Sequence, residues 1–188
     1  MTNPTWRIVA AALFMAIAFP ATSATKDEQR QDIRETANAT LERLYKAQPK
    51  AKDAIDRAAG YAVFSNFGMK IFFAGGGQGA GIAVNRKTKQ ETFMKMVEVQ
   101  AGLGVGVKKF RLVWIFETTQ KLDDFVNKGW EMGAQATAAA QMSGQGQEVY
   151  AGAVSVSPGV WLYQLTDDGL AVELTAKGTK YYKDSELN

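Results

Sequence analysis

The stretch "GGGQGAGIAV", Gly75–Val84, decides the fold that we expect for this chain. Glycines at this density occur in loops that bind phosphate, and also in strands where another group needs the space of the missing side chain. Every second position from Gly77 to Ala83 is glycine or alanine, and the positions between them become apolar towards Val84. Because a period of two is typical of a strand, we predict a strand here.

A second glycine-rich stretch, "AGLGVGVKK", Ala101–Lys109, follows the same pattern. Apolar residues alternate with glycine or polar residues over the eleven positions 97–107, which predicts one strand that continues into "KKFRLVWIF". Glycine in a strand permits strong coiling of the sheet, or the close approach of another backbone or a ring. Two such strands therefore predict a tightly curled, barrel-like antiparallel sheet.

Neither glycine-rich stretch matches a nucleotide-binding motif. A P-loop requires Gly-Lys followed by Ser or Thr after its glycines, and no such tripeptide follows here. The dinucleotide motif requires a third glycine where this chain has Ala80, and a helix directly after it. We therefore expect neither a nucleotide nor any other cofactor.

The chain of 188 residues contains no cysteine and no histidine. Their absence excludes disulfides, thiol nucleophiles, zinc sites built from these residues and an imidazole base. The acidic pairs Asp123-Asp124 and Asp167-Asp168 do not suggest a catalytic dyad, because adjacent side chains on a helix or strand point apart. They also supply too few ligands for calcium. We therefore expect no enzyme activity and no metal site.

The first 24 residues have the character of a secretory signal peptide. Arg7 precedes an apolar run, Ile8–Phe19, which Pro20 ends, and small residues follow up to Ala24. An uncleaved membrane anchor is the alternative, but the twelve apolar residues are fewer than the ~20 that span a bilayer. We predict cleavage near Ala24, export to the periplasm or envelope, and one domain over residues 25–188.

Residue periodicity locates helices and strands in the rest of the chain. Apolar residues recur at spacings of three and four over 26–47, 49–60 and 119–128, which predicts three helices. Further strands are expected over 61–67, 69–75, 130–141, 148–156, 159–166, 170–175 and 180–184, with a turn at Asp167–Gly169. For 130–141, an alanine-rich helix is the alternative, because alanine favours helices. The predicted fold class is α+β, with N-terminal helices packed on a strongly curled, largely antiparallel, barrel-like sheet and one further short helix near 119–128.

Basic residues are concentrated in the middle of the sequence. Residues 60–118 carry eight basic and three acidic side chains, whereas residues 119–188 carry five basic and nine acidic ones. Six basic residues are candidates for binding lipid or another anion, three at the tip of a predicted hairpin over 85–91 and three on the strand after it: Arg86, Lys87, Lys89, Lys108, Lys109 and Arg111. Near an anionic surface, each of these residues could contribute ~1 kcal/mol to the free energy of binding. An ordinary solvated surface is the alternative.

The order of these elements resembles the SYLF lipid-binding domain family, also described as an actin-binding domain after its yeast members. The matching segments are "AAGYAVFSNFG", "GGGQGAGIAVNR", "VQAGLGVGVKKFRLVWIFET", "LDDFVNKGWEMGAQATAAA" and "LTDDGLAVELTAKG". The resemblance implies no enzyme activity, since eukaryotic members bind phosphoinositide-containing membranes and some bind actin. Gln78 and Asp168 stand where the family often has basic residues, so the resemblance implies the fold and a general affinity for lipid surfaces.

Two functions follow from these observations. The resemblance and the basic middle segment favour a non-enzymatic module that binds an anionic phospholipid or envelope surface. The alternative is a structural or protein-interaction domain of the periplasm that does not bind lipid directly. We expect neither a nucleic acid nor a nucleotide as partner.

Overall fold

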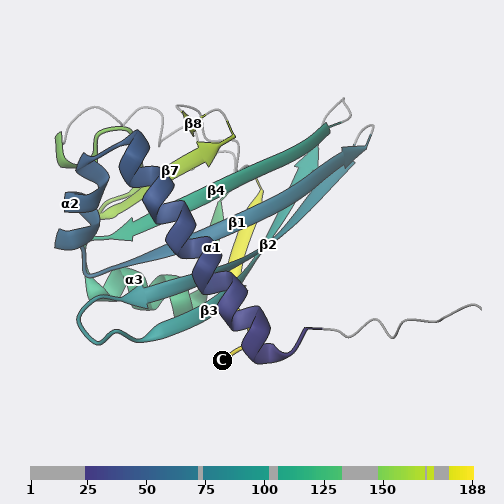
Figure 1. Cartoon of the computed structure of the whole chain (residues 1–188), viewed down its shortest axis with the longest axis horizontal. Helices are drawn as coiled ribbons and strands as arrows, with labels where there is room; N and C mark the ends of the chain where they lie inside the picture. Colours follow the sequence, from purple (N-terminus) through teal and green to yellow (C-terminus); the bar gives the residue numbers. More distant parts are fainter. Residues whose placement is uncertain (1–23, 72–73, 102–105, 133–147, 168, 172–177) are drawn as a thin grey trace, which may run out of the picture.

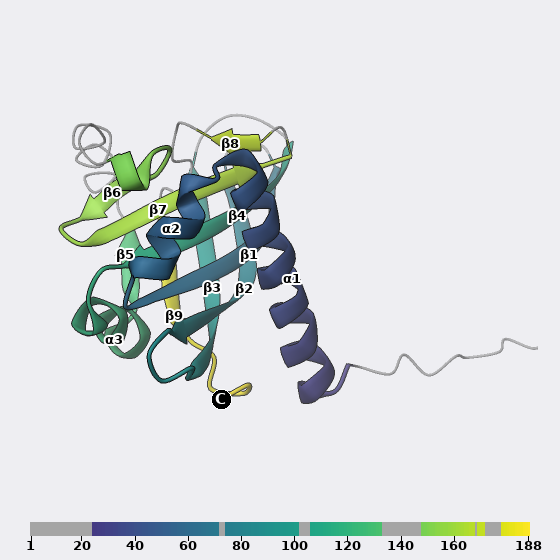
Figure 2. The ribbon, with the colours of Figure 1, turned by 60° about the vertical axis from the view of Figure 1, so that its left-hand side comes forward.

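A computed structural model describes residues 24–71, 74–101, 106–132, 148–167, 169–171 and 178–188 (Figure 1). The helices are α1 (Lys26–Ala47), α2 (Lys50–Arg57) and α3 (Thr119–Lys128), together with the short 3₁₀ helix η1 (Glu148–Tyr150). The strands are β1 (Gly60–Ile71), β2 (Ala74–Asn85), β3 (Glu91–Ala101), β4 (Gly106–Phe116), β5 (Trp130–Met132), β6 (Val154–Ser157), β7 (Val160–Thr166), β8 (Gly169–Ala171) and β9 (Thr179–Lys183). The fold is α+β, as predicted, with helices packed on a curled antiparallel sheet (Figure 2).

The described strands form one sheet in the order β5-β9-β3-β2-β1-β4-β7-β6, and β8 pairs with β7. At its centre, β3 and β4 flank the β2–β1 pair and run in opposite directions. The prediction of one strand through 97–107 is therefore wrong, and residues 102–105 lie outside the described residues. A period of two is the same in both strands, so it does not reveal where the chain reverses.

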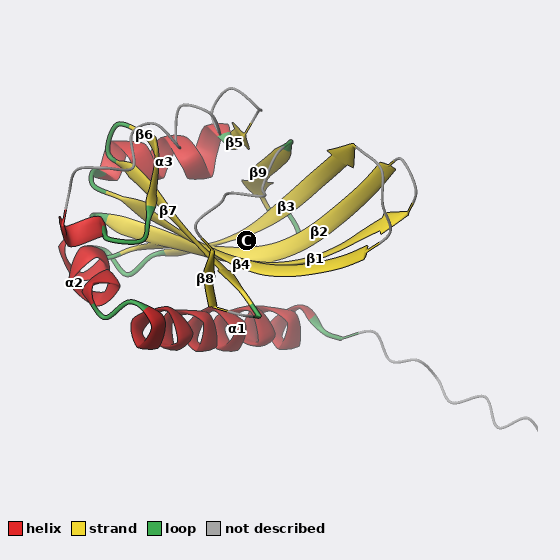
Figure 3. Ribbon diagram, turned by 90° about the horizontal axis from the view of Figure 1, so that it is seen from above, coloured by secondary structure: helices red, strands yellow, loops and turns green. Residues whose placement is uncertain are grey.

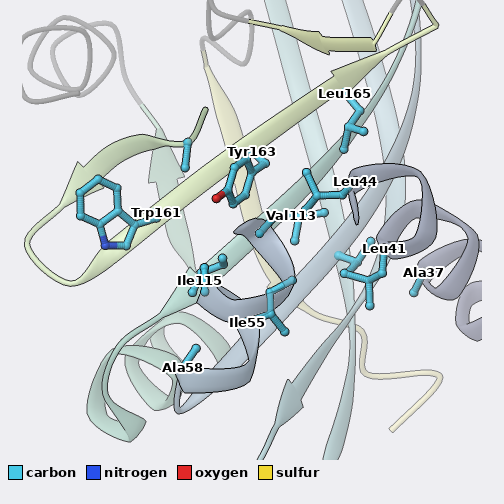
Figure 4. Packing of buried hydrophobic residues seen from close by; sticks show 14 of the residues in the cluster. Ala37, Leu41, Leu44, Ile55, Ala58, Val113, Ile115, Trp161, Tyr163 and Leu165 are labelled. Atoms are coloured by element: carbon cyan, nitrogen blue, oxygen red, sulfur yellow. The ribbon is translucent and has the colours of Figure 1, made fainter. Parts of the chain in front are cut away.

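The sheet separates two hydrophobic cores. On its convex face, Leu44 of α1 and Ile55 of α2 pack in a cluster that includes Tyr163 of β7 (Figures 3 and 4). On the concave face, Phe125 of α3 packs with Trp114 of β4. Successive residues of β4 alternate between the cores, with Leu112, Trp114 and Phe116 on the concave side and Val113 and Ile115 on the convex side. Both faces of this part of β4 are covered, which explains the continuous apolar run Leu112–Phe116.

Local sequence features set the ends of α1 and α3 where they were predicted. In the capping box of α1, the Glu28 amide donates to the Thr25 side chain at 3.2 Å, and the Thr25 amide donates to the Glu28 carboxylate at 2.6 Å. Thr118 caps the start of α3. The helix ends before Gly129, whose φ of 75° lies in the left-handed region that favours glycine. These caps satisfy backbone groups that the helices themselves leave without partners.

Two glycines of the sheet are required by close packing. A Cβ at Gly81 of β2 would collide with the ring of Phe64 and with the Val63 carbonyl oxygen. This confirms the predicted strand, and also the expectation that a glycine there admits a ring. A Cβ at Gly60 would approach the side chain of Leu122 to 2.5 Å. At these positions the absent side chain is what lets the neighbouring layers meet.

Several predicted boundaries need correction. The second helix ends at Arg57, because Ala58 is extended and Gly60 already belongs to β1. In the predicted strand 148–156, η1 takes the first three residues and β6 begins only at Val154. The strands over 159–166 and 180–184 are confirmed, within one residue, as β7 and β9, and β8 pairs with β7 across the predicted turn. Residues 133–141 and 172–175, where strands were also predicted, lie outside the described residues.

The C-terminal residues are tied to β3 and α1. The Phe93 amide donates to Asn188 Oδ1 at 3.0 Å, and Asn188 Nδ2 donates to the Phe93 carbonyl at 2.8 Å. Arg30 Nε of α1 donates to the Leu187 carbonyl at 2.9 Å, and the Leu187 side chain is buried. The Asn188 side chain thus continues the hydrogen bonding of β9 along the edge of β3.

Three tyrosines set an alkaline limit to stability. Burial is the main cause that raises the pKa of Tyr45, Tyr150 and Tyr163 to about 12 each. Unfolded tyrosine ionises near pH ~10. Their contribution is therefore fully present below about pH 10 and is lost as the pH rises from about 10 to about 12. We expect the urea midpoint to fall in this window as tyrosinate absorbance rises. A urea midpoint that stays unchanged across this pH window would contradict the prediction.

Candidate functional site

The turn between β2 and β3 places two lysines at one end of the sheet. Asn85 organises the turn: its carbonyl accepts from the Lys89 amide at 2.8 Å, and its Oδ1 accepts from the Lys87 and Thr88 amides at 3.0 and 3.1 Å. Asparagine suits this position because its side chain mimics a backbone carbonyl. The Lys87 and Lys89 side chains are exposed, and within the described residues their ammonium groups make no ion pair or hydrogen bond.

Lys89 has a backbone conformation that most side chains avoid. Its φ is 61°, in the left-handed region, and among the described residues no other non-glycine residue has a positive φ. For a residue with a Cβ this conformation costs roughly 1–2 kcal/mol. Backbone strain is commonly found at functional positions. An exposed lysine in a strained position, close to a second exposed lysine, therefore makes the β2–β3 turn a candidate site.

Replacing Lys89 by glycine should stabilise the fold by about 0.5–1 kcal/mol, because glycine adopts a positive φ without the Cβ clash and loses only part of that gain to its greater flexibility when unfolded. Urea unfolding at pH 7 measures the change. Lys87→Gly is the matched control, since Lys87 has no positive φ, and it should be neutral or destabilising. Equal effects of the two substitutions would contradict the assignment of strain to Lys89.

Arg86, which was predicted to lie at the tip, instead holds α2 against the turn. Its Nη1 donates to the Ile55 carbonyl at 2.7 Å, its Nη2 pairs with Asp56 at 3.1 Å, and its amide donates to the Ala59 carbonyl at 3.0 Å. Lys52 bonds the same carboxylate at 2.7 Å; this bond, together with the charge of Arg86, holds the pKa of Asp56 below its usual value. Arg86 is therefore part of the internal contacts of the fold.

The other three predicted residues lie towards the opposite end of the sheet. In the register of β1, Lys109 lies opposite Phe67, whereas Asn85 at the turn lies opposite Gly60. Seven residues of strand separate these rows, about 23 Å at ~3.3 Å per residue. Lys108 adjoins Lys109, and half-buried Arg111 lies two residues nearer the turn end. The six candidates thus form two groups, and only the group at the β2–β3 turn has described exposed lysines.

A polar hollow beside the turn was missed from the sequence. It has a volume of about 90 Å³ and lies between α3 and the strands β2, β3 and β9. Its polar lining comprises Asn85, Gln90, Thr92, Asp123, Asn127 and Lys183. Asn85 and Gln90 flank the residues of the turn, so the hollow adjoins Lys87 and Lys89. Lys183 reaches this place through the pairing of β9 with β3, opposite Met94, which no local pattern predicts.

Comparison with known proteins supports the predicted resemblance. A family model, Ysc84, described as Las17-binding protein actin regulator, matches residues 97–188. Over 163 residues the chain is also 36% identical to Beta cell expansion factor A of Aeromonas veronii. These matches show the resemblance to the SYLF family, whose domain model covers residues 97–188. The aligned region covers 87% of this chain and 60% of that relative, so the chain spans about 60% of the relative's length.

The SYLF domain is known for binding lipid and actin, and the family is not an enzyme family. The adjacent acids Asp123 and Asp124 have different surroundings, because Asp123 lines the hollow while Asp124 pairs with Lys128 at 2.7 Å. The described residues contain no group of three or more acidic, histidine or cysteine side chains that could hold a metal ion. None of the helices within the described ranges is both long enough and apolar enough to cross a bilayer.

Proposed function

We propose that this domain is a non-enzymatic module that binds anionic membrane surfaces through the β2–β3 turn. The observation that carries the proposal is the pair of exposed lysines, Lys87 and Lys89, one of which occupies a strained backbone position. Their ammonium groups have no partner within the described residues, so binding a phosphate breaks no internal contact. Each lysine near an anionic surface contributes ~1 kcal/mol. The lipid binding known for the family supports the same function.

Sedimentation with vesicles tests this proposal. The wild-type domain should bind vesicles of phosphatidylglycerol and phosphatidylcholine more tightly than phosphatidylcholine alone, and added salt should weaken the difference. The double variant Lys87→Gln/Lys89→Gln should bind the anionic vesicles roughly 25-fold more weakly, at ~1 kcal/mol per lysine. Lys26→Gln/Lys46→Gln, which removes two exposed lysines from α1, is the matched control and should bind as the wild type does. Equal losses in both variants would reject the turn as the site.

The Lys89→Gly variant separates binding from stability. It should unfold at a higher urea concentration, because the strain is relieved, yet bind anionic vesicles roughly fivefold more weakly, since one cation of ~1 kcal/mol is lost. A variant that gains stability and binds equally well would show that the lysine charge is not used.

We also propose that the domain acts at the cell envelope after export. The apolar run Ile8–Phe19 supports this, and so does the position of the first cap: cleavage after Ala24 leaves Thr25 with the capping box of α1 complete. The mass of the mature protein in the periplasmic or envelope fraction tests this proposal. A mature chain that still carries residues 1–24, or one found only in the cytoplasm, would contradict it.

A protein partner is the second candidate, because the matching family model is described as a Las17-binding protein. Chemical crosslinking in intact cells, followed by mass spectrometry, distinguishes the two functions. A single protein crosslinked in stoichiometric amounts, with no binding to anionic vesicles, would favour this alternative over lipid binding.

A further inference from the structure

We propose that the polar hollow binds a phosphoethanolamine group, with Lys183 at the phosphate and Asp123 at the ammonium. The inference deepens the proposed membrane function, on which it rests, by naming the head group that the surface selects. It depends on two opposite charges that line one hollow and are not paired with each other.

The charges of the hollow are unneutralised within the described residues. Lys183 and Asp123 line the same cavity, yet no ion pair joins them and neither has another. Neighbouring acids behave differently: Asp124 pairs with Lys128 at 2.7 Å, and Asp184 pairs with Lys95 at 3.2 Å. Two opposite charges that line one cavity without pairing with each other match a ligand that carries both signs.

Regular elements hold the two walls of the hollow. Asp123 and Asn127 are four residues apart on α3, so they lie on the same face of the helix, and Phe125 of that helix is completely buried. On the other wall, Lys183 lies opposite Met94, and Thr92 is two residues from Met94 on the same face of β3. The helix and strands thus fix the backbone positions of Asp123 and Lys183, whose side chains are exposed beside the hollow.

The size and chemistry of the lining select a small zwitterionic head group. A volume of about 90 Å³ is well below the ~300–1,000 Å³ of pockets for larger organic ligands, so the hollow suits a small group. Lys183, the amides of Gln90 and Asn127 and the Thr92 hydroxyl offer donors to phosphate oxygens. The Asp123 carboxylate accepts from a primary ammonium, whereas the quaternary ammonium of choline has no N–H to donate. The carboxylate also disfavours a purely anionic ligand such as inorganic phosphate.

The test compares vesicles of equal net charge. Phosphatidylethanolamine and phosphatidylcholine are both zwitterionic, so the general attraction of Lys87 and Lys89 to a charged surface is the same for each. The wild-type domain should bind vesicles containing phosphatidylethanolamine about tenfold more tightly than pure phosphatidylcholine, the effect of about one charge-assisted hydrogen bond. Asp123→Asn and Lys183→Gln should each abolish this preference while circular dichroism remains native. Glu42→Gln, an exposed acid on α1 at the convex face, should retain it.

Phosphatidylglycerol vesicles separate this inference from the proposed function. Asp123→Asn removes a negative charge, so it should bind them at least as tightly as the wild type while losing the preference for phosphatidylethanolamine. Binding to phosphatidylglycerol that needs Lys87 and Lys89, without any preference for phosphatidylethanolamine, would overturn the inference and leave the proposed function standing. No binding to either vesicle, together with no binding of a soluble phosphoethanolamine ester, would overturn both.

Soluble ligands identify the source of the head group. Glycerophosphoethanolamine should shift the amide resonances of Asp123 and Lys183 and compete with the vesicles, whereas inorganic phosphate should do neither. Competition by both ligands alike would overturn the zwitterionic assignment. Binding of the soluble ester without any response to vesicles would support the assignment and identify a free phosphoethanolamine ester, not a membrane lipid, as the ligand.

Discussion

Gly81→Ala should destabilise the fold by about 3 kcal/mol, the upper part of the range for overpacked sites. The added Cβ would collide with the ring of Phe64, which is completely buried, and with the carbonyl oxygen of Val63, which belongs to the backbone of β1. A flexible side chain could rotate away, but the backbone of a central strand moves only with its neighbours. The β1–β2 pairing must then separate or Phe64 must leave the concave core.

Urea unfolding followed by circular dichroism measures this change. Ala80→Ser is the matched control, because Ala80 is the adjacent residue of β2 and is exposed on the opposite face of the sheet. We expect the control to change the free energy of unfolding by less than about 0.5 kcal/mol, as for most surface substitutions. If Gly81→Ala were equally mild, glycine would not be required there, and our explanation of this glycine in the strand would be wrong.

Trp114→Ala should lower the free energy of unfolding by about 3–5 kcal/mol, the range for removing a large aromatic side chain from a core. Trp114 is completely buried at the centre of the concave core. Its ring lies 5.0 Å from that of Tyr181 and 5.1 Å from that of Phe125. It also meets Trp130 at 5.9 Å and stacks on Phe116 at 6.4 Å. Its loss leaves a cavity between β4, β9 and α3 that these rings cannot fill together.

Trp114→Phe distinguishes lost packing from lost hydrogen bonding. Within the described residues, the Trp114 Nε1 has no hydrogen-bond partner although it is buried. The Trp114→Phe variant therefore loses side-chain volume but no hydrogen bond, and we expect its free energy of unfolding to fall by about 1–2 kcal/mol. Calorimetric or urea unfolding of both variants provides the comparison. A cost for Trp114→Phe as large as that for Trp114→Ala would show that the indole nitrogen has a partner that stabilises the fold.

The two proposals depend on different charges at the same end of the sheet. Lys87 and Lys89 provide attraction to any anionic surface, whereas the hollow adds selection among head groups through Asp123 and Lys183. The contribution of Lys87 and Lys89 to binding falls with added salt. The contribution of the hollow depends on short-range hydrogen bonds, so salt screens it less. Salt dependence of binding therefore offers an independent check on how much each term contributes.

The candidate site was predictable only in part. The period of the sequence located the hairpin tip, and Lys87 and Lys89 are exposed there as expected. The same period gave no reason to separate Arg86 from them, although Arg86 bonds to Ile55 and Asp56. That difference depends on α2 packing beside the turn, which is a contact between residues about thirty positions apart.

The sequence by itself determined the features that depend on near neighbours along the chain. The alternation around Gly81, the capping box at Thr25 and the end of α3 at Gly129 all involve residues within four positions of one another, so each can be derived from local chemistry.

Only the tertiary structure decided where the chain reverses between β3 and β4, which lysines are exposed without partners, and that Lys183 and Asp123 line one hollow. The physical reason is that these relations arise from strand order and register. Register depends on how distant segments share one buried face, and no local period contains that information.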